Sequence, residues 1–241
     1  MNSREYLECV PLAARAAHLF STRQLELPAD AALRQKNIEA FARDLGVEPP
    51  ALRRAAQVHG CGVLVISGGD MPPQILPSAD AVVSGAPGTA CAVQIADCVP
   101  ILVAGENAVA AIHAGWRGTA AGVVAEAVRA LAAIGSTTPT LVAAIGPSIG
   151  PCCYQVDDRV RDAFRASAQW GAAEGAFAPD GAGFWRLDVA AVNRRMLESL
   201  GVPREQIHAS GLCTACDRGR FYSYRAEGAG TGRLIAGIVA S

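Results

Sequence analysis

One stretch of the chain carries side chains that bind metals or act as nucleophiles. It runs from Gln94 to Gly118, with Asp97-Cys98 near its start and His113 near its end. Apolar runs on both sides of Gly105-Glu106-Asn107 predict two buried strands joined by a tight turn. In a hairpin, the start of the first strand lies beside the end of the second. We therefore expect Cys98 and His113 to be close together.

A cysteine sulfur and an imidazole at one end of a sheet indicate half of a zinc or copper site. The chain has four histidines, so three remain to supply the missing ligand. Cysteine with histidine is also the composition of a nucleophile pair, and the residues alone leave both chemistries open. Serine-nucleophile, Walker A and dinucleotide-binding motifs do not occur in a suitable context.

The residues after His113 favour a small-molecule pocket. In Gly115-Trp116-Arg117-Gly118 the glycines permit close backbone approach. The indole offers a stacking face, and the guanidinium can hold an anion.

A second group of cysteines gives a weaker signal. Cys213 and Cys216 have the spacing C-x₂-C, and the pair Cys152-Cys153 could complete a four-thiolate zinc site. The same spacing occurs in redox dithiols. Because a lone C-x₂-C is unspecific and a vicinal pair is an unusual second half, the sequence assigns neither function. The remaining cysteines outside both groups are expected to be packed: Cys9, Cys61 and Cys91.

Composition excludes several classes of protein. The 241 residues are 51% hydrophobic, which is enough for a large core. With 21 basic and 22 acidic residues and no basic run, nucleic acid is not an expected partner. The apolar runs fall short of the ~18 residues of a membrane span, and no secretory signal opens the chain. We therefore expect no membrane association and a cytoplasmic protein with reduced cysteines.

The pattern of apolar residues, glycines and caps predicts four helices and at least seven strands. The helices are expected over 30–45 (with Asp30 as N-cap), 119–134, 157–169 and 187–200. Strands are expected over 62–66, 79–83, 109–113, 140–145, 207–212 and 233–239, and one or two buried strands over 90–103. Loops are expected over 68–73 and 171–183. Because several strands follow one another without helices, the order predicts a single α/β domain over 1–241 with a mixed sheet.

Five motifs in order resemble a known family. They are Gln57-Val58-His59-Gly60, Ala96-Asp97-Cys98-Val99-Pro100, His113-Ala114-Gly115-Trp116-Arg117-Gly118, Ile145-Gly146-Pro147-Ser148-Ile149-Gly150 and Phe221-Tyr222-Ser223-Tyr224-Arg225. Together they are similar to the YfiH/LACC1 family of laccase-domain proteins. Its members are called multicopper polyphenol oxidases, purine nucleoside phosphorylases and peptidoglycan editing factors. The resemblance extends from about Leu19 to the end of the chain.

The resemblance implies a single-domain α/β/α sandwich with a mixed sheet, of the YfiH/CNF1-like type. It also implies a catalytic metal triad of His59, Cys98 and His113, which holds zinc, with copper as the alternative. Three protein ligands leave one coordination position open, as in catalytic zinc sites. The implied activities are phosphorolysis of adenosine, inosine, guanosine and methylthioadenosine, and deamination of adenosine. Purine nucleosides and phosphate are then the partners of an expected monomer.

Other residues of the motifs acquire expected roles from these chemistries. Arg117 is the first candidate to bind phosphate and Arg23 the second. Trp116 either stacks on the purine or walls the pocket, and Gln57 is expected to hydrogen-bond the nucleoside. Arg225 is a further pocket residue, although a structural role for its segment is favoured. The chain after Arg23 lacks the Gly-Gly turn and long loop usual in the family, which leaves nucleoside preference open.

Two alternative functions follow from the same residues. A copper-dependent polyphenol oxidase needs several copper sites, and four histidines are too few for them. A cysteine-dependent enzyme that edits peptidoglycan precursors, or a protein that binds them, would use Cys98 in place of a metal centre.

Overall fold

The computed structural model describes residues 4–28, 30–67 and 76–241, so the loop expected over 68–73 lies outside the described residues. The strands in these ranges form three sheets, of orders β13-β9-β7-β8-β5-β4, β1-β2-β14-β6-β3 and β10-β12-β11. The strands are β1 (Tyr6–Leu7), β2 (His18–Ser21), β3 (Leu52–Arg53), β4 (Val63–Ile66), β5 (Ala81–Ser84), β6 (Ala90–Ile95), β7 (Val99–Ala104), β8 (Val109–Ala114), β9 (Val142–Ile145), β10 (Gln155–Asp157), β11 (Phe177–Pro179), β12 (Phe184–Leu187), β13 (Ile207–Ala209) and β14 (Leu234–Val239).

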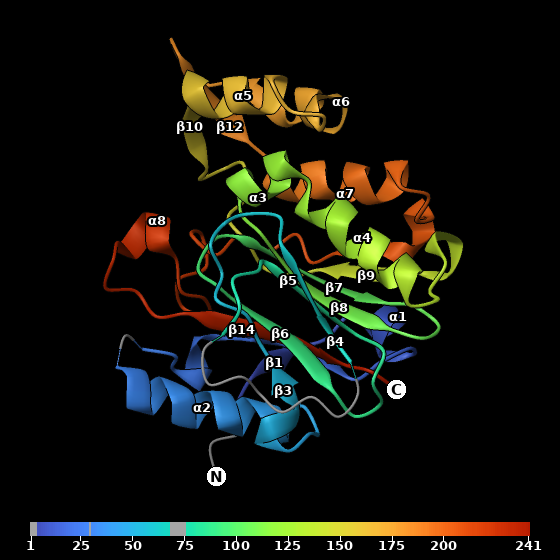
Figure 1. The fold of residues 1–241 in the computed structure, drawn as a ribbon. Helices are drawn as coiled ribbons and strands as arrows, with labels where there is room; N and C mark the ends of the chain where they lie inside the picture. The colour runs from blue at the N-terminus through green and yellow to red at the C-terminus, as the bar shows by residue number, and fades with distance from the viewer. Residues whose placement is uncertain (1–3, 29, 68–75) are drawn as a thin grey trace.

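Helices cover both outer faces of the two larger sheets (Figure 1). Helix α2 (Ala31–Asp44) lies against the five-stranded sheet, and α4 (Val123–Ala133) and α7 (Val189–Ser199) lie against the six-stranded sheet. The remaining helices are α1 (Val10–Ala13), α3 (Trp116–Ala121), α5 (Asp158–Arg165), α6 (Trp170–Ala173) and α8 (Tyr224–Glu227). The predicted α/β class, with helices on both sides of mixed sheets, is confirmed.

The β layer between the helices is double, because the two larger sheets pack face to face. Every residue of β7 and β8 is buried. Along β7, Ile101 and Val103 belong to the core beneath the helices, whereas Leu102 and Ala104 belong to the core between the sheets. Side chains alternate between the faces of a strand, so a strand covered on both faces is apolar throughout.

Two predicted helices are confirmed, and the first has its predicted cap, Asp30. The carboxylate of Asp30 accepts a hydrogen bond from the Leu33 amide at the start of α2, and Asp188 does the same for Ala191 at the start of α7. Such caps satisfy backbone donors that a helix leaves unpaired at its N-terminus.

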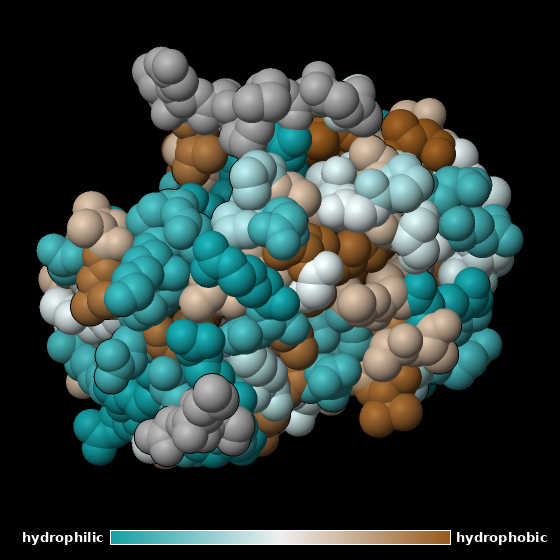
Figure 2. Space-filling model, turned by 90° about the horizontal axis from the view of Figure 1, so that it is seen from below, coloured by the Kyte–Doolittle hydropathy of each residue, from teal (hydrophilic) through white to brown (hydrophobic). Residues whose placement is uncertain are grey.

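Figure 2 views the molecule from the side of α2, where hydrophilic side chains predominate on the surface.

Two predictions about the second half of the chain are wrong. The helix expected over 119–134 begins earlier, at Trp116, and is divided into α3 and α4 at Gly122, whose φ of 87° is left-handed. The loop expected over 171–183 contains the end of α6 and strand β11, which pairs with β12. Ala173 and Ala176 are buried there, so small residues that suggested an exposed loop are instead packed in the core. In the described part of the chain, no helix has the length and apolarity to cross a membrane.

Candidate metal centre and its cavity

The predicted hairpin brings Cys98 and His113 to one end of the six-stranded sheet. Strands β7 and β8 are antiparallel, with Pro100 paired to His113 and Val99 to Ala114. Cys98 immediately precedes β7, so it lies beside the end of β8. The sequence could predict this proximity because both strands are continuous apolar runs around one short turn.

His59 completes the cluster from a loop before β4. One ligand atom from each of His59, Cys98 and His113 lies within 4.8 Å of the other two. The two imidazole rings meet edge to face with centroids 4.9 Å apart. His113 is buried and Cys98 partly buried, while His59 is exposed. Two imidazoles and one thiol at these separations are a donor set suited to a zinc or copper ion.

Asp80, at the start of β5, organises the two histidines. Its carboxylate accepts hydrogen bonds from the His113 Nδ1 at 2.8 Å and from the His59 amide at 2.9 Å. The amides of Val58 and Gly60 also donate to it, at 3.2 and 2.7 Å. With Nδ1 occupied, His113 presents Nε2 to the cluster, as metal-binding histidines with a carboxylate partner do.

No functional role for Asp80 follows from the sequence analysis. A carboxylate at the start of a buried strand requires partners, and that is the signal that could have marked it. Its partners lie before and after it in the chain, so the local pattern gives no indication of which residues they are.

The same contacts determine the protonation of the cluster. Burial opposes ionisation of Cys98, but hydrogen bonds with His113 and His59 outweigh it and lower the pKa of the thiol to about 7. Burial would lower the pKa of His113, but hydrogen bonds to Asp80 and Cys98 raise it to about 9. For Asp80, burial is outweighed by the hydrogen bond from His113 and by backbone donors, so its pKa is lowered. The thiol is therefore prepared to become the thiolate that binds metals.

Two residues of the site have left-handed backbone conformations that are unusual outside glycine. The φ of His59 is 59° and that of Asp97 is 87°. The Asp97 carboxylate is fixed by the Thr214 hydroxyl at 2.7 Å and by the Arg225 amide at 2.6 Å. Such conformations persist only where the surroundings hold them, and they concentrate at functional sites.

Because Gly115 has no side chain, it leaves room for the side chains of the cluster. A Cβ at this position would lie 2.9 Å from the Cys98 sulfur and 3.2 Å from the His59 ring. Both distances are too short, so two of the three candidate ligands would have to move.

We therefore expect Gly115→Ala to weaken Zn²⁺ binding about tenfold or more, as changes beside metal ligands do. Competition with a chromophoric chelator measures the affinity. Gly171→Ala is the matched control, because no atom lies within 4 Å of the added Cβ. Equal Zn²⁺ affinities in the two variants would show that the cluster does not need the space at Gly115.

The cluster opens onto a cavity of about 850 Å³ whose lining is cationic. Among the described residues that line it, five are arginines and one is an acid, Asp97. The arginines are Arg34, Arg54, Arg117, Arg225 and Arg233. A cavity with this charge is suited to an anionic ligand.

Three of the other predicted pocket residues line the cavity: Trp116, Arg117 and Arg225. The guanidinium of Arg117 stacks on the Trp116 indole at 4.3 Å. Arg225 stacks on Tyr154 at 4.9 Å, and its side chain also donates to the Gln155 carbonyl at 2.9 Å.

Gln57 and Arg23 have protein partners. Gln57 lines the cavity, but both ends of its amide bond the backbone of Gln94, at 2.7 and 2.8 Å. Arg23 does not occur among the described residues that line the cavity. Its guanidinium bonds Glu227 and the Arg218 carbonyl and stacks on Tyr222.

Gln94 is a cavity residue that the sequence analysis did not single out as a binding group. Its side-chain Nε2 is buried and has no hydrogen-bond partner among the described residues. A buried donor without a partner is costly, and this one would meet a ligand only if the cavity wall moved.

Known proteins resemble this chain over most of its length. The family model described as multi-copper polyphenol oxidoreductase laccase matches residues 26–241. A purine nucleoside phosphorylase of Streptomyces coelicolor is 42% identical over 84% of this chain and 80% of its own. An adenosine deaminase named RL5, from an unknown prokaryotic organism, is 34% identical over 82% of this chain and 78% of its own. The crystal structure of the Bacillus licheniformis hypothetical protein YfiH has a TM-score of 0.91 and 29% identity, covering 100% and 98% of the two chains.

Proposed function

The chain belongs to the multi-copper polyphenol oxidoreductase laccase family, and from this premise we propose that it is a zinc-dependent purine nucleoside phosphorylase that also deaminates adenosine. One observation carries the proposal: the cluster of His59, Cys98 and His113 lies at the edge of an arginine-lined cavity. The relatives named for phosphorolysis and deamination support it. The eight cysteines are free thiols, which is typical of a reducing compartment and favours a cytoplasmic enzyme.

The residues present fit zinc, because two imidazoles and a thiol with a lowered pKa would leave one coordination position for substrate. A zinc ion held there would supply Lewis acidity to the purine base or to an attacking water. Arg117 lines the cavity and is the residue that we expect to hold phosphate, and its stacking on Trp116 limits the directions its guanidinium can take. Gln94 lines the cavity, and a movement of its side chain would bring an unused amide donor toward a ring nitrogen or carbonyl of the base.

Product analysis tests the proposed function directly. Purified protein is incubated with adenosine, with and without phosphate, and adenine, inosine and hypoxanthine are separated. Adenine with an equal amount of ribose 1-phosphate is expected when phosphate is present, and inosine with ammonia when it is absent. Inosine, guanosine and methylthioadenosine are tested in the same way. Unchanged nucleosides with zinc-loaded protein would overturn the proposal.

Arg117→Gln separates the two proposed activities. Losing a charge-assisted hydrogen bond to phosphate is expected to raise the KM for phosphate about tenfold or more. Deamination, which does not use phosphate, should keep most of its rate. Arg129→Gln is the control, since Arg129 is exposed, paired with Glu126 and absent from the described lining of the cavity. An equal loss of both activities in Arg117→Gln would assign this residue to the base or the metal centre instead.

The histidines give little support to multicopper phenol oxidation. His18 is buried and uses both ring nitrogens, one toward the Cys9 amide at 2.9 Å and the other toward the Ala16 carbonyl at 3.1 Å. His208 lies on β13, outside the cluster. Only His59 and His113 are then available as imidazole ligands at this site, whereas several copper ions require a larger set.

A further inference from the structure

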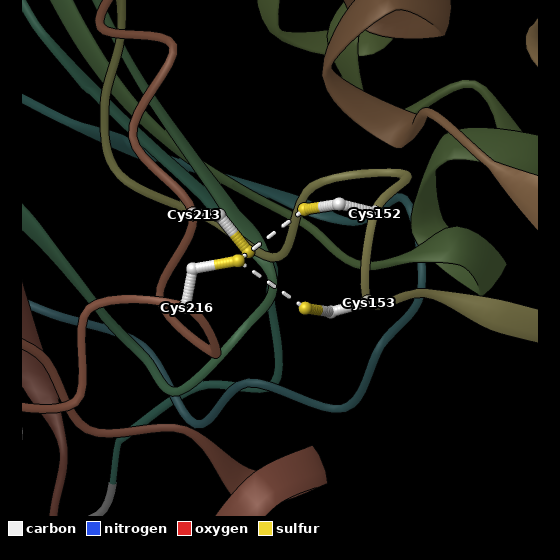
Figure 3. Close-up of side chains that lie close together, drawn as sticks. All are labelled: Cys152, Cys153, Cys213 and Cys216. Carbon is white, nitrogen blue, oxygen red and sulfur yellow. Dashed lines mark hydrogen bonds between the residues drawn. The ribbon is translucent and has the colours of Figure 1, made fainter.

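The two cysteine pairs that are distant in sequence meet at one point. Cys152 and Cys153 lie in the turn between β9 and β10, and Cys213 and Cys216 in the segment after β13. Figure 3 shows the four sulfur atoms turned toward one another from these two segments. All four lie within 4.8 Å of one another, and the Cys216 sulfur is 3.5 Å from that of Cys152 and 3.4 Å from that of Cys153.

We propose that these four cysteines bind a second zinc ion, with a structural role and separate from the His59, Cys98 and His113 cluster. A tetrahedral tetrathiolate site with Zn–S bonds of about 2.3 Å has sulfur atoms about 3.8 Å apart. The two shortest separations, 3.5 and 3.4 Å, are slightly below that value, and the others do not exceed 4.8 Å, so small side-chain rotations suffice for binding. A disulfide needs sulfur atoms about 2.05 Å apart, and the four thiols are free. Four protein ligands would close the coordination shell, as in structural rather than catalytic zinc sites.

The surroundings suit a cluster of thiolates. On binding, the four thiols release their protons to solvent, and four thiolates around Zn²⁺ carry a net charge of −2. The Gly150 amide donates to the Cys213 sulfur at 3.2 Å, and the Arg186 guanidinium donates to the Cys152 carbonyl at 3.1 Å. The amide places a backbone donor beside the sulfurs, and Arg186, which also pairs with Asp180 at 2.7 Å, holds the backbone of Cys152. A Cβ at Gly150 would lie 3.3 Å from the Cys152 sulfur and 3.4 Å from the Cys213 Cβ, so glycine keeps that space open.

One of the segments that the ion would join lines the cavity, and the other contacts a residue that lines it. Ser148 and Leu212 share a backbone hydrogen bond, and Thr214, next to Cys213, holds the Asp97 carboxylate at 2.7 Å. Tyr154, next to Cys153, lines the cavity. Zinc at the four cysteines would therefore fix two segments that position residues around the first cluster. Cys152 and Cys216 are exposed, so the ion would lie near the surface.

Zinc content and a cobalt spectrum test this site independently of the nucleoside reaction. The double variant Cys152→Ser/Cys216→Ser is expected to contain one zinc fewer per chain than the wild type and to melt at a lower temperature. Both replaced residues are exposed, so the core is not disturbed. Cys61→Ser, outside both clusters, should match the wild type, and His59→Ala should keep the second zinc.

The Co²⁺-substituted His59→Ala protein should show the sulfur-to-cobalt charge-transfer and intense visible bands of a tetrahedral tetrathiolate. Zinc content in the double variant equal to that of the wild type would overturn the proposal. Metal-free thiols in the wild type that oxidise to disulfides and return with reductant would overturn it in favour of a redox dithiol.

Discussion

Cys98→Ala and His113→Ala are each expected to abolish phosphorolysis without unfolding the chain. Each variant removes one of three candidate ligands, and the remaining two would hold zinc weakly. Loss of the electrostatic stabilisation that a bound metal supplies lowers kcat by about 10²–10³-fold or more. Adenine release from adenosine and phosphate measures the rate, and circular dichroism measures the fold.

Cys61→Ala is the matched control for Cys98→Ala, because Cys61 is also partly buried but lies outside the cluster. It should keep wild-type activity and zinc content. Full phosphorolysis in either ligand variant would remove the metal centre from the mechanism. Retained zinc together with lost activity in Cys98→Ala would instead favour a nucleophilic thiol.

Outside the triad, Asp80 is expected to be the residue whose replacement most reduces metal affinity and the free energy of unfolding. In Asp80→Asn the charge opposite His113 is lost, and an amide group faces backbone donors. Removing a partner of a metal-binding histidine reduces metal affinity or activity by about 10–100-fold. In Asp80→Ala, four hydrogen-bond donors lose their acceptor, and breaking a buried ion pair costs about 3–5 kcal/mol in the free energy of unfolding.

Urea denaturation of the metal-free proteins measures that cost, and chelator competition measures the affinity. Glu198→Ala removes a half-buried carboxylate paired with Arg194 and should cost at most about 0.5 kcal/mol after solvent screening. If Asp80→Ala and Glu198→Ala have the same free energy of unfolding, Asp80 does not hold the site together.

The sequence predicted the hairpin of the site because the hairpin is local. Two apolar runs, one short turn and the positions of Cys98 and His113 suffice to place these residues at one end of a sheet. His59 was assigned from the family resemblance, since the distance along the chain from His59 to the hairpin does not reveal that they meet. The expected roles of Arg23 and Gln57 remain predictions, and both side chains already have protein partners.

Features that depend on distant contacts did not follow from the sequence. An apolar strand such as β7 looks the same whether its second face is covered by a helix or by another sheet. Asp80 binds residues on both sides of it in the chain, and no local pattern identifies them. The two cysteine pairs were visible as motifs, but their meeting depends on how β9 and β13 pair.

The three candidate ligands differ in how firmly the chain holds them. His113 belongs to a strand paired on both sides and buried on both faces, so displacing it means breaking the sheet. His59 lies on an exposed loop whose nearby amides are anchored by one carboxylate. We therefore expect thermal opening of the cluster to start at His59, since displacing that loop breaks only a few hydrogen bonds. A bound ion would then enter and leave by this side while the hairpin stays folded.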